Sequence, residues 1–387
     1  MQSFQHVTPP LRLFSGPDSL KQLGRELDRI GSRRAVVFCG PWAEGPLLDA
    51  VRAGMGERCA GVYLGVAAHS PVASVQEAAG ELKRLQADAV IALGGGSSIV
   101  TARAGSILAA EDGDARSLCT TRDANGNLHS PKLPAPKLPQ FIVPTTPTTA
   151  LVKAGSALFD PATGERLALF DPKTRAHAIF IDPQMIQSSP RPLVVNASIN
   201  TLSMAIEGLS SRSGNPISDA LLMHVVRLVA RNLPALMSAD DDDVRAQLLL
   251  AAVMCGQGTD HTGAGITTVL GHAIGARHHL DNGIANAIVL AHMLRFNGSA
   301  NEPGLQKVAS ALELPSAAGE PLVRSVVEAI EALFEPLGVA RRLRDVGIAH
   351  EGLPEIAGQA IGDWFLRGNP RPVRDEGELL QVLDQAW

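Results

Sequence analysis

An apolar run that ends in three consecutive glycines constrains the fold of this chain most. Residues 90–104 read Val-Ile-Ala-Leu-Gly-Gly-Gly-Ser-Ser-Ile-Val-Thr-Ala-Arg-Ala, so a run rich in β-forming residues passes through the glycines directly into a helical pattern. Glycine lets a ligand approach the backbone, and a helix start offers unpaired N–H groups and a positive dipole end to an anion. The pattern is neither GxGxxG nor the Walker sequence. It predicts a strand–turn–helix unit that binds a dinucleotide pyrophosphate, with a purely structural turn as the alternative.

Composition and charge exclude several classes of protein. The chain has 387 residues, enough for two domains and a large core, and 45% of them are hydrophobic. Its net charge is −5 and it has no long basic run, so we expect no nucleic-acid partner. The sequence shows no charged-then-apolar leader and no uninterrupted apolar stretch of membrane-spanning length. The four cysteines have no short spacing, which indicates reduced thiols. We therefore expect a cytoplasmic protein without a membrane partner.

The organisation of the chain changes near Asp182. Before it, short apolar runs alternate with amphipathic stretches, which predicts a parallel sheet covered by helices on both faces. Ser156-Ala-Leu-Phe and Arg166-Leu-Ala-Leu-Phe flank the turn sequence Asp-Pro-Ala-Thr-Gly and predict a hairpin. After Asp182, stretches rich in Ala, Leu and Met follow helical periodicity. We predict an α/β domain over residues 1–184 and an all-helical domain over 185–387, with a site in the cleft between them.

Several motifs are spread over the chain. They are Gly94-Gly-Gly-Ser, Val143-Pro-Thr-Thr, Ile181-Asp-Pro, Ala205-Ile-Glu-Gly-Leu-Ser-Ser and Asn282-Gly-Ile-Ala-Asn-Ala-Ile-Val-Leu-Ala-His. Together they resemble the iron-dependent alcohol dehydrogenase superfamily over nearly the full length. Three others resemble its maleylacetate reductase branch: His69-Ser-Pro-Val, Asn369-Pro-Arg-Pro-Val and the terminal Ala386-Trp387. The resemblance implies a Rossmann-like α/β dinucleotide-binding domain, an all-helical domain, the dehydroquinate synthase-like fold of iron-containing alcohol dehydrogenases, and a homodimer.

The same resemblance implies a site for NAD or NADP. The glycine turn would hold the phosphates, and the loop after Val143-Pro would lie near the adenine and nicotinamide side. The implied residues are Gly40, Gly94, Gly95, Gly96, Ser97, Ser98, Thr145, Thr146 and Thr149. Many relatives carry an Asp after the second strand that meets the adenine ribose, but Cys39-Gly40 stands there in this chain. A carboxylate would repel a 2′-phosphate, so its absence permits NADP and removes an attraction for NAD.

The positions of the family's metal ligands have changed. Relatives that bind iron or zinc carry an Asp and a His four residues apart on one helix face, then two His fourteen apart. At the matching positions this chain has Asn200 and Met204, then Thr268 and Asn282. Two amides, a thioether and a hydroxyl cannot offset the cost of desolvating Fe²⁺ or Zn²⁺. We therefore expect no metal and assign these four residues to a substrate pocket, where the amides could donate to a substrate oxygen.

Without a metal, another group must stabilise the charge that develops on a substrate oxygen. His272 lies four residues past Thr268 on the same predicted helix face and matches a histidine that the family keeps beside the metal. It is our first candidate for a general acid. His278 and His279, on the loop before Asn282, are the further catalytic candidates. The alternatives are a structural, hydrogen-bonded ring for His272 and a surface pair for the other two.

Three functions remain open at this point. The first is a metal-independent NAD(P)H-dependent oxidoreductase that resembles maleylacetate reductase and acts on a small oxo or enoic acid or a related carbonyl or alcohol. The second is a non-redox lyase, hydratase or cyclase. It is favoured by Val100, which stands where relatives commonly have Asp, and by the loop Pro144-Thr-Thr-Pro-Thr-Thr-Ala-Leu-Val-Lys, which differs from the family's short Ala-Gly-rich turn. Arg103 stands where relatives commonly have Lys. The third is a catalytically inactive homologue, favoured by the loss of every metal ligand.

Overall fold

The structure is a computed structural model that describes residues 3–123 and 128–387. The chain divides into two compact units: one is Pro9–Ser189, and the other is Pro190–Trp387 together with the residues before Pro9. We had expected a division into 1–184 and 185–387. The N-terminal residues group with the helices because Nε2 of His261 lies 3.0 Å from the carbonyl oxygen of Val7, and the rings of His6 and His261 stack with centroids 3.9 Å apart.

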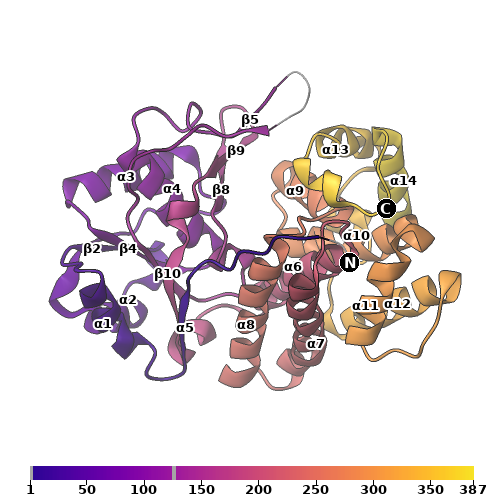
Figure 1. Cartoon of the computed structure of the whole chain (residues 1–387), viewed down its shortest axis with the longest axis horizontal. Helices are drawn as coiled ribbons and strands as arrows, with labels where there is room; N and C mark the ends of the chain where they lie inside the picture. Colours follow the sequence, from indigo (N-terminus) through magenta and orange to yellow (C-terminus); the bar gives the residue numbers. More distant parts are fainter. Residues whose placement is uncertain (1–2, 124–127) are drawn as a thin grey trace. The chain divides into compact units, whose positions relative to one another are not determined.

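The Pro9–Ser189 unit is built on a six-stranded parallel sheet, as predicted (Figure 1). Its strands in spatial order are β1 (Arg12–Ser15), β10 (Ala176–Ile181), β7 (Gln140–Pro144), β4 (Ala89–Gly94), β2 (Ala35–Phe38) and β3 (Cys59–Tyr63). The central strands β2, β4 and β7 are buried along their whole length. Strands covered on both faces read as continuous apolar runs, which is why these segments show no alternation of polar and apolar residues.

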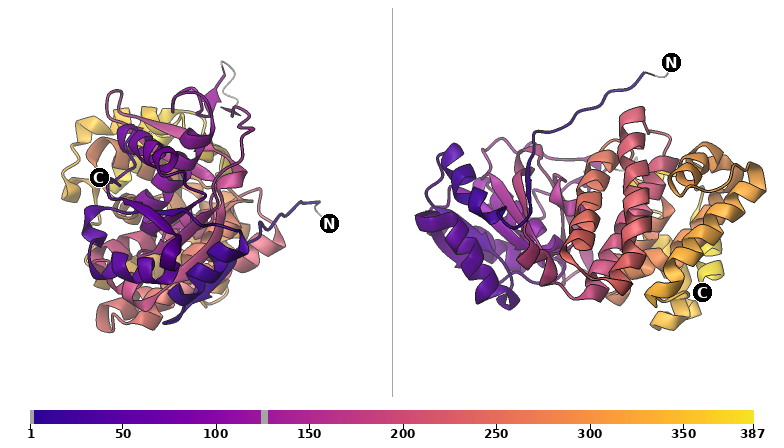
Figure 2. Two further views of the ribbon diagram at one scale, coloured as in Figure 1. Left: turned by 90° about the vertical axis from the view of Figure 1, so that its left-hand side faces the viewer. Right: turned by 90° about the horizontal axis from the view of Figure 1, so that it is seen from below.

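Helices cover both faces of this sheet (Figures 1 and 2). They are α1 (Leu23–Arg29), α2 (Pro46–Met55), α3 (Val72–Arg84), α4 (Gly96–Ala110) and the short α5 (Pro183–Gln187). One core cluster joins Leu27 of α1 and Val51 of α2 to strand residues such as Ile91. On the other face, a Cβ on Gly105 of α4 would lie 3.4 Å from Phe38 of β2. The glycine therefore lets α4 pack directly on the strand.

The strand order places a topological switch between β2 and β4. The chain leaves β2 through α2 to β3 on one side, and then returns through α3 to β4 on the other side of β2. In open α/β sheets, ligands bind outside the carboxyl ends of the strands at such a point. Cys39-Gly40 follows β2 and the glycine turn follows β4. Two of the predicted cofactor-binding segments therefore lie at the switch.

Two small antiparallel pairs complete this unit. The predicted hairpin is confirmed: β8 (Gly155–Asp160) pairs with β9 (Glu165–Phe170), so that Phe159 lies opposite Arg166. A shorter pair joins β5 (Thr121–Arg122) to β6 (Leu128–His129).

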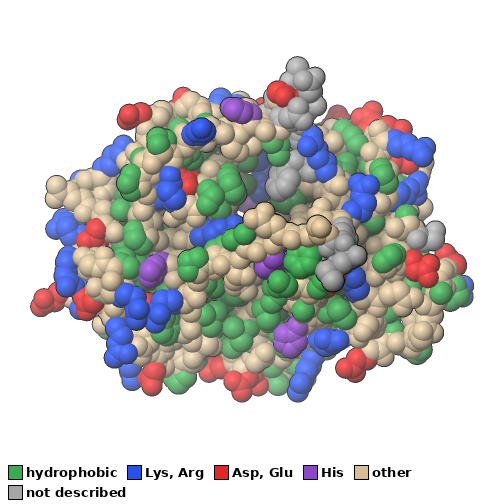
Figure 3. All heavy atoms as spheres, viewed as in Figure 1, with side chains coloured by type: hydrophobic (Ala, Val, Ile, Leu, Met, Phe, Trp, Pro, Cys, Tyr) green, Lys and Arg blue, Asp and Glu red, His purple; other side chains and the backbone are tan. Residues whose placement is uncertain are grey.

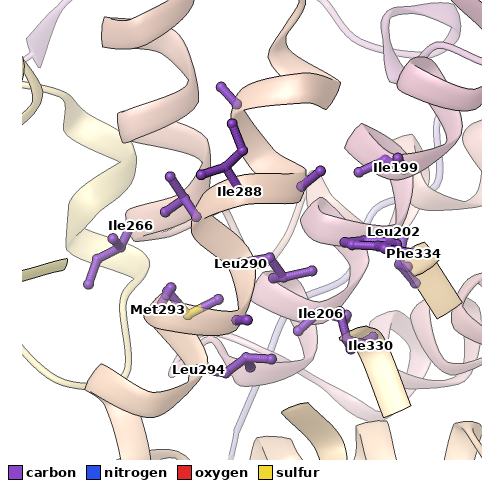
Figure 4. Close-up of a cluster of buried hydrophobic side chains, with 14 of the residues drawn as sticks. Ile199, Leu202, Ile206, Ile266, Ile288, Leu290, Met293, Leu294, Ile330 and Phe334 are labelled. Carbon is purple, nitrogen blue, oxygen red and sulfur yellow. The ribbon is translucent and has the colours of Figure 1, made fainter. Parts of the chain in front are cut away.

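The second unit is helical, as predicted. Its helices are α6 (Arg191–Ser210), α7 (Pro216–Ser238), α8 (Asp242–Thr259), α9 (Ile266–His278), α10 (Asn282–Asn297), α11 (Glu302–Ala311), α12 (Gly319–Phe334), α13 (Leu353–Ala360) and α14 (Glu376–Ala386). Figure 4 shows part of its core, to which α6, α10 and α12 contribute Ile199, Leu202, Ile206, Leu290, Leu294, Ile330 and Phe334. Helices α6 and α10 are buried on most sides. Polar residues on them lie inside the unit and need hydrogen-bond partners.

Helix α7 is the one helix, among the described residues, that is long and apolar enough to cross a membrane. Length and composition alone do not distinguish a membrane-spanning helix from the core helix of a soluble protein. In α7, Leu222, Val225, Val226 and Val229 are fully buried and belong to the core cluster of the unit. Their spacing of three and four residues marks one helix face. The helix therefore has the pattern of a core element.

Candidate functional site

The glycine turn joins β4 to α4 in a conformation that side chains would not allow. Gly94 has a φ of +136°, a region that favours glycine. A Cβ on Gly94 would lie 2.5 Å from Oγ of Ser98, and one on Gly95 would lie 2.8 Å from Oγ1 of Thr146. In this described segment, no side chain caps the N-terminus of α4. The turn can therefore present the first N–H groups of a 15-residue helix to an anion.

The threonine loop after β7 lies against this turn. The amide of Thr145 donates to the carbonyl oxygen of Gly94 at 3.1 Å, and Oγ1 of Thr148 lies 3.5 Å from where a Cβ on Gly96 would be. Thr149 begins a short 3₁₀ helix, η4 (Thr149–Leu151), which packs against α4. The structure thus gathers the predicted glycines and threonines at the carboxyl ends of β4 and β7.

The two serines of the turn differ in their surroundings. Oγ of Ser97 accepts a hydrogen bond from the amide of His69 at 3.1 Å, and the Ser97 carbonyl accepts one from the hydroxyl of Ser70 at 3.1 Å. Ser98 is buried against Gly94. Both residues help to fix the turn, and Ser97 also ties it to the loop after β3.

Arg103 has a structural role that its sequence position did not suggest. Its side chain is fully buried; Nη1 donates to the carbonyl oxygen of Gly155 and Nη2 to that of Ala150, both at 2.6 Å. These bonds attach α4 to η4 and to the start of β8. The guanidinium therefore supports the segment that follows the threonine loop.

Gly40 closes the end of β2. A Cβ there would lie 2.7 Å from Cδ1 and Nε1 of Trp42 and 3.3 Å from the carbonyl oxygen of Val66. The preceding Cys39 is buried, and burial raises the pKa of its thiol to about 11. The end of β2 thus offers backbone and an indole at Gly40 and Trp42.

In the helical unit, Asn200 and Met204 lie one turn apart on α6. Nδ2 of Asn200 is 3.8 Å from Sδ of Met204, and the side-chain amides of Asn200 and Asn286, the latter on α10, meet at 3.0 Å. A Cβ on Gly271 of α9 would lie 2.2 Å from Oδ1 of Asn286, so glycine makes room for this amide. Asn286 was not predicted, although it lies one helical turn after Asn282.

Thr268 is engaged by a buried carboxylate. Glu207 of α6 accepts hydrogen bonds from the amide of Thr267 at 2.6 Å, from the amide of Thr268 at 3.2 Å and from the hydroxyl of Thr268. These amides belong to the first turn of α9, so the carboxylate satisfies the helix N-terminus and faces its positive dipole end. Burial nevertheless raises the pKa of Glu207, because the charged form is removed from water.

Asn282 begins α10, with its Oδ1 2.9 Å from where a Cβ on Gly275 of α9 would be. The four residues assigned to the substrate pocket, Asn200, Met204, Thr268 and Asn282, therefore come from three helices that pack on one another, α6, α9 and α10. Within residues 3–123 and 128–387, no group of three or more His, Cys, Asp or Glu side chains gathers in a way that could hold a metal ion.

His272 is paired with an acidic residue. Its Nδ1 lies 2.9 Å from Oδ2 of Asp363, and its ring centroid lies 5.8 Å from that of Phe365. Oδ1 of Asp363 accepts from the amide of Phe365 at 3.0 Å and caps the 3₁₀ helix η10 (Trp364–Gly368). The His272 side chain is 25% exposed. The ring of His272 is thus hydrogen-bonded, as in the structural alternative, and the same bond forms an Asp–His pair suited to proton transfer.

The other two candidate histidines lie at the end of α9. His279 is exposed and has a left-handed backbone conformation with φ +54°, and it is the C-cap residue of α9. The pKa of His278 is lowered by burial and by the neighbouring Arg277 and His279, and its Nε2 is buried without a hydrogen bond in the described structure. Neither has a contact to an acidic group in the described structure that resembles the bond of His272 to Asp363.

Comparison with known proteins matches both units to one family. Residues 10–183 match the model for iron-containing alcohol dehydrogenase, and residues 194–387 match that for the Fe-containing alcohol dehydrogenase family, C-terminal.

Individual relatives agree with this match. Lactaldehyde reductase of Escherichia coli (strain K12) is 29% identical over 376 residues, covering 96% of this chain and 94% of the relative. Maleylacetate reductase of Sphingobium indicum is 26% identical over 379 residues, covering 97% and 95%. A crystal structure of 1,3-propanediol oxidoreductase superimposes with a TM-score of 0.91 at 22% identity over all of both chains, which supports the fold.

Proposed function

Because the chain belongs to the iron-containing alcohol dehydrogenase family and is an NAD(P)-dependent oxidoreductase, we propose that it works without a metal ion, on a small oxo or enoic acid or a related carbonyl compound. Two features support the proposal: the resemblance places the family's metal ligands at four positions that carry neutral side chains here, and His272 on α9, one turn after Thr268, is paired with a carboxylate. The reaction would resemble that of maleylacetate reductase.

The donor set at the metal positions does not fit iron or zinc. Asn200, Met204, Thr268 and Asn282 offer no charge and no imidazole. The Thr268 hydroxyl already donates to Glu207, and the Glu207 carboxylate is taken up by the first turn of α9. Iron and zinc sites require thiolate, imidazole or carboxylate ligands to offset the desolvation of the ion. We therefore assign no catalytic step to a metal.

The glycine turn fits a dinucleotide. The glycines let the turn pack tightly against Ser98 and Thr146, and no side chain in this described segment caps α4, so its first N–H groups can bind a pyrophosphate. Bound NAD(P)H supplies the hydride. Gly94 to Ser98 would hold the phosphates, and Thr145, Thr146 and Thr149 would line the same loop cluster.

The proton is assigned to His272. Asp363 holds Nδ1 of the ring, which fixes its orientation. Hydride addition to a carbonyl carbon leaves a negative oxygen, and hydride addition to an enoic acid leaves a carbanion. A proton from His272 neutralises either one. His278 and His279 are weaker candidates for the general acid, because no carboxylate contacts either of them among the described residues.

A direct experiment tests metal independence. The purified protein is assayed for NADH and NADPH oxidation with small oxo and enoic acids, before and after exhaustive chelation, and its metal content is measured by mass spectrometry. We expect turnover with an acidic substrate, the same rate after chelation and no stoichiometric iron or zinc. Activity that disappears on chelation and returns with Fe²⁺ or Zn²⁺ would refute the proposal. Failure to oxidise either nucleotide with any substrate would favour the inactive-homologue alternative.

We also propose a cytoplasmic homodimer with no nucleic-acid or membrane partner. On the face drawn in Figure 3, Lys and Arg side chains are interspersed with Asp and Glu, as on a surface without a nucleic-acid partner. Strand β1 lies at an edge of the sheet, and an edge strand carries backbone groups that can pair with another chain. Light scattering after gel filtration tests the dimer: a mass near 81 kDa is twice the 40.6 kDa of one chain.

A further inference from the structure

The loop after β2 carries an exposed indole at the topological switch. Trp42 lies in the 3₁₀ helix η2 (Pro41–Ala43), and 53% of its surface is exposed. Burying a tryptophan removes a large apolar area from water, so an exposed one in a short, well-defined loop calls for an explanation.

The indole lies across the ends of two neighbouring strands. Its Cζ2 is 3.1 Å from where a Cβ on Gly94 would be, and its Cδ1 and Nε1 are 2.7 Å from where a Cβ on Gly40 would be. Glycines at both places let the ring rest on the backbone. The ring is thus in contact with the glycine turn itself and continues its surface toward the end of β2.

This position belongs to the adenosine half of a bound dinucleotide. When a pyrophosphate occupies the helix N-terminus after one strand, the adenosine extends toward the end of the adjacent strand at the switch point. Here that strand is β2, whose end carries the buried Cys39, then Gly40 and the indole, rather than a carboxylate for the ribose. An exposed aromatic face is a stacking surface for a nucleobase.

We propose that Trp42 is the adenine-recognition residue of this enzyme, with its indole stacked on the adenine ring of NAD(P)H. The inference rests on the proposed function, because it assumes that the glycine turn holds the pyrophosphate. Stacking does not depend on the ribose 2′ position. Trp42 therefore contributes to the binding of both dinucleotides, where an acidic residue would favour NAD.

Calorimetry with fragments of the cofactor tests this assignment. The probes are NADH, ADP-ribose, which contains the adenine, and nicotinamide mononucleotide, which lacks it. Base–aromatic stacking contributes about 1–3 kcal/mol per base, so W42L should weaken ADP-ribose and NADH binding by roughly 5- to 140-fold. W42F keeps an aromatic face and should stay within about threefold of the wild type. Nicotinamide mononucleotide affinity should be unchanged in both variants.

Fluorescence gives a second readout that does not require turnover. AMP should quench the tryptophan emission of the wild type and of the control variant W387F, because Trp387 lies in the helical unit with its Nε1 bonded to the Ile348 carbonyl oxygen. The W42F variant should lose this quenching.

The outcomes separate the two proposals. If the wild type binds ADP-ribose but W42L binds it equally well, or if W42L loses ADP-ribose and nicotinamide mononucleotide to the same extent, Trp42 does not recognise adenine and the proposed function stands. If the wild type binds neither NADH nor NADPH, the proposed function fails, and this inference fails with it.

Discussion

Oδ2 of Asp363 lies 2.9 Å from Nδ1 of His272, which joins the cap of η10 to the middle of α9 across 91 residues of sequence. A carboxylate in this position keeps one ring nitrogen protonated and orients the other, so the pair can hold and deliver a proton. The same carboxylate caps η10 through the amide of Phe365 at 3.0 Å, so its own position is fixed by a second bond.

Replacing His272 tests the assignment of the general acid. We expect H272A to lower kcat by about 10²–10⁴, because proton transfer by a positioned group contributes this much, with cofactor affinity unchanged. D363N keeps a hydrogen-bonding group but removes the charge, so it should give a smaller loss and a shifted pH profile. Steady-state kinetics from pH 5 to 9 measures both effects.

The matched control is His261, whose Nε2 lies 3.0 Å from the carbonyl oxygen of Val7. H261A should retain the wild-type kcat and change stability instead. A wild-type rate in H272A would remove His272 from the mechanism.

Replacing Arg103 tests its role as a support for the threonine loop. In R103M, the carbonyl oxygens of Gly155 and Ala150 lose a buried charged donor, and each unsatisfied group costs about 1–3 kcal/mol. We expect the free energy of unfolding to fall by about 2–5 kcal/mol and NAD(P)H affinity to fall as the loop loosens. Urea unfolding and calorimetry measure the two quantities.

Arg116 provides the comparison for that experiment. It is exposed and pairs with Asp160 at 2.8 Å and with Glu165 at 2.8 Å. R116M should cost less than about 1 kcal/mol, as surface ion pairs do, and should leave cofactor affinity unchanged. Equal effects in R103M and R116M would contradict the structural role of Arg103.

The buried Glu207 predicts a pH dependence of stability. Its pKa in the folded protein is raised above the ordinary 4.5 by burial, so the folded state holds this proton at pH values where the unfolded state has lost it. The contribution of Glu207 to the free energy of unfolding is therefore largest below pH 4.5. It decreases as the pH rises from 4.5 to the raised pKa of the folded state. E207Q cannot titrate. We expect the stability of the wild type relative to E207Q to decrease between pH 4.5 and 7, as measured by chemical unfolding at fixed temperature.

A constant difference between the wild type and E207Q over this range would show that the pKa of Glu207 is not raised. E207A should be less stable than E207Q at every pH, because it leaves the amides of Thr267 and Thr268 without an acceptor.

Local patterns predicted most of the fold. The apolar runs predicted the strands, because a strand that is covered on both faces has no need of polar residues. The turn residues after Asp160 predicted the β8–β9 hairpin. The periodic stretches after Asp182 predicted the helical unit. These features depend on short segments of the sequence, which is why a single sequence is enough to identify them.

The partners in the candidate site could not be predicted in the same way. Asp363 meets His272, and Glu207 meets Thr268, only because distant helices pack together, and no spacing in the sequence reports such a contact. Arg103 is flanked by Ala102 and Ala104, which fits a core position, but an arginine on a helix is exposed by default. Its burial depends on carbonyl groups supplied by η4 and β8.

A substitution in the glycine turn tests cofactor affinity separately from the stability of the fold. A Cβ on Gly95, the residue before the first turn of α4, would lie 2.8 Å from Oγ1 of Thr146 and would force the turn or the threonine loop to shift at the proposed phosphate site. We expect G95A to weaken NADH and NADPH binding at least about tenfold, which corresponds to 1.4 kcal/mol, while the fold is retained. The control is G80A in α3, where a Cβ would meet nothing within 4 Å, so it should stabilise the helix by about 0.5–1 kcal/mol without changing affinity. Calorimetric titration and thermal unfolding of both variants provide the comparison, and unchanged cofactor affinity in G95A would exclude the turn as the phosphate site.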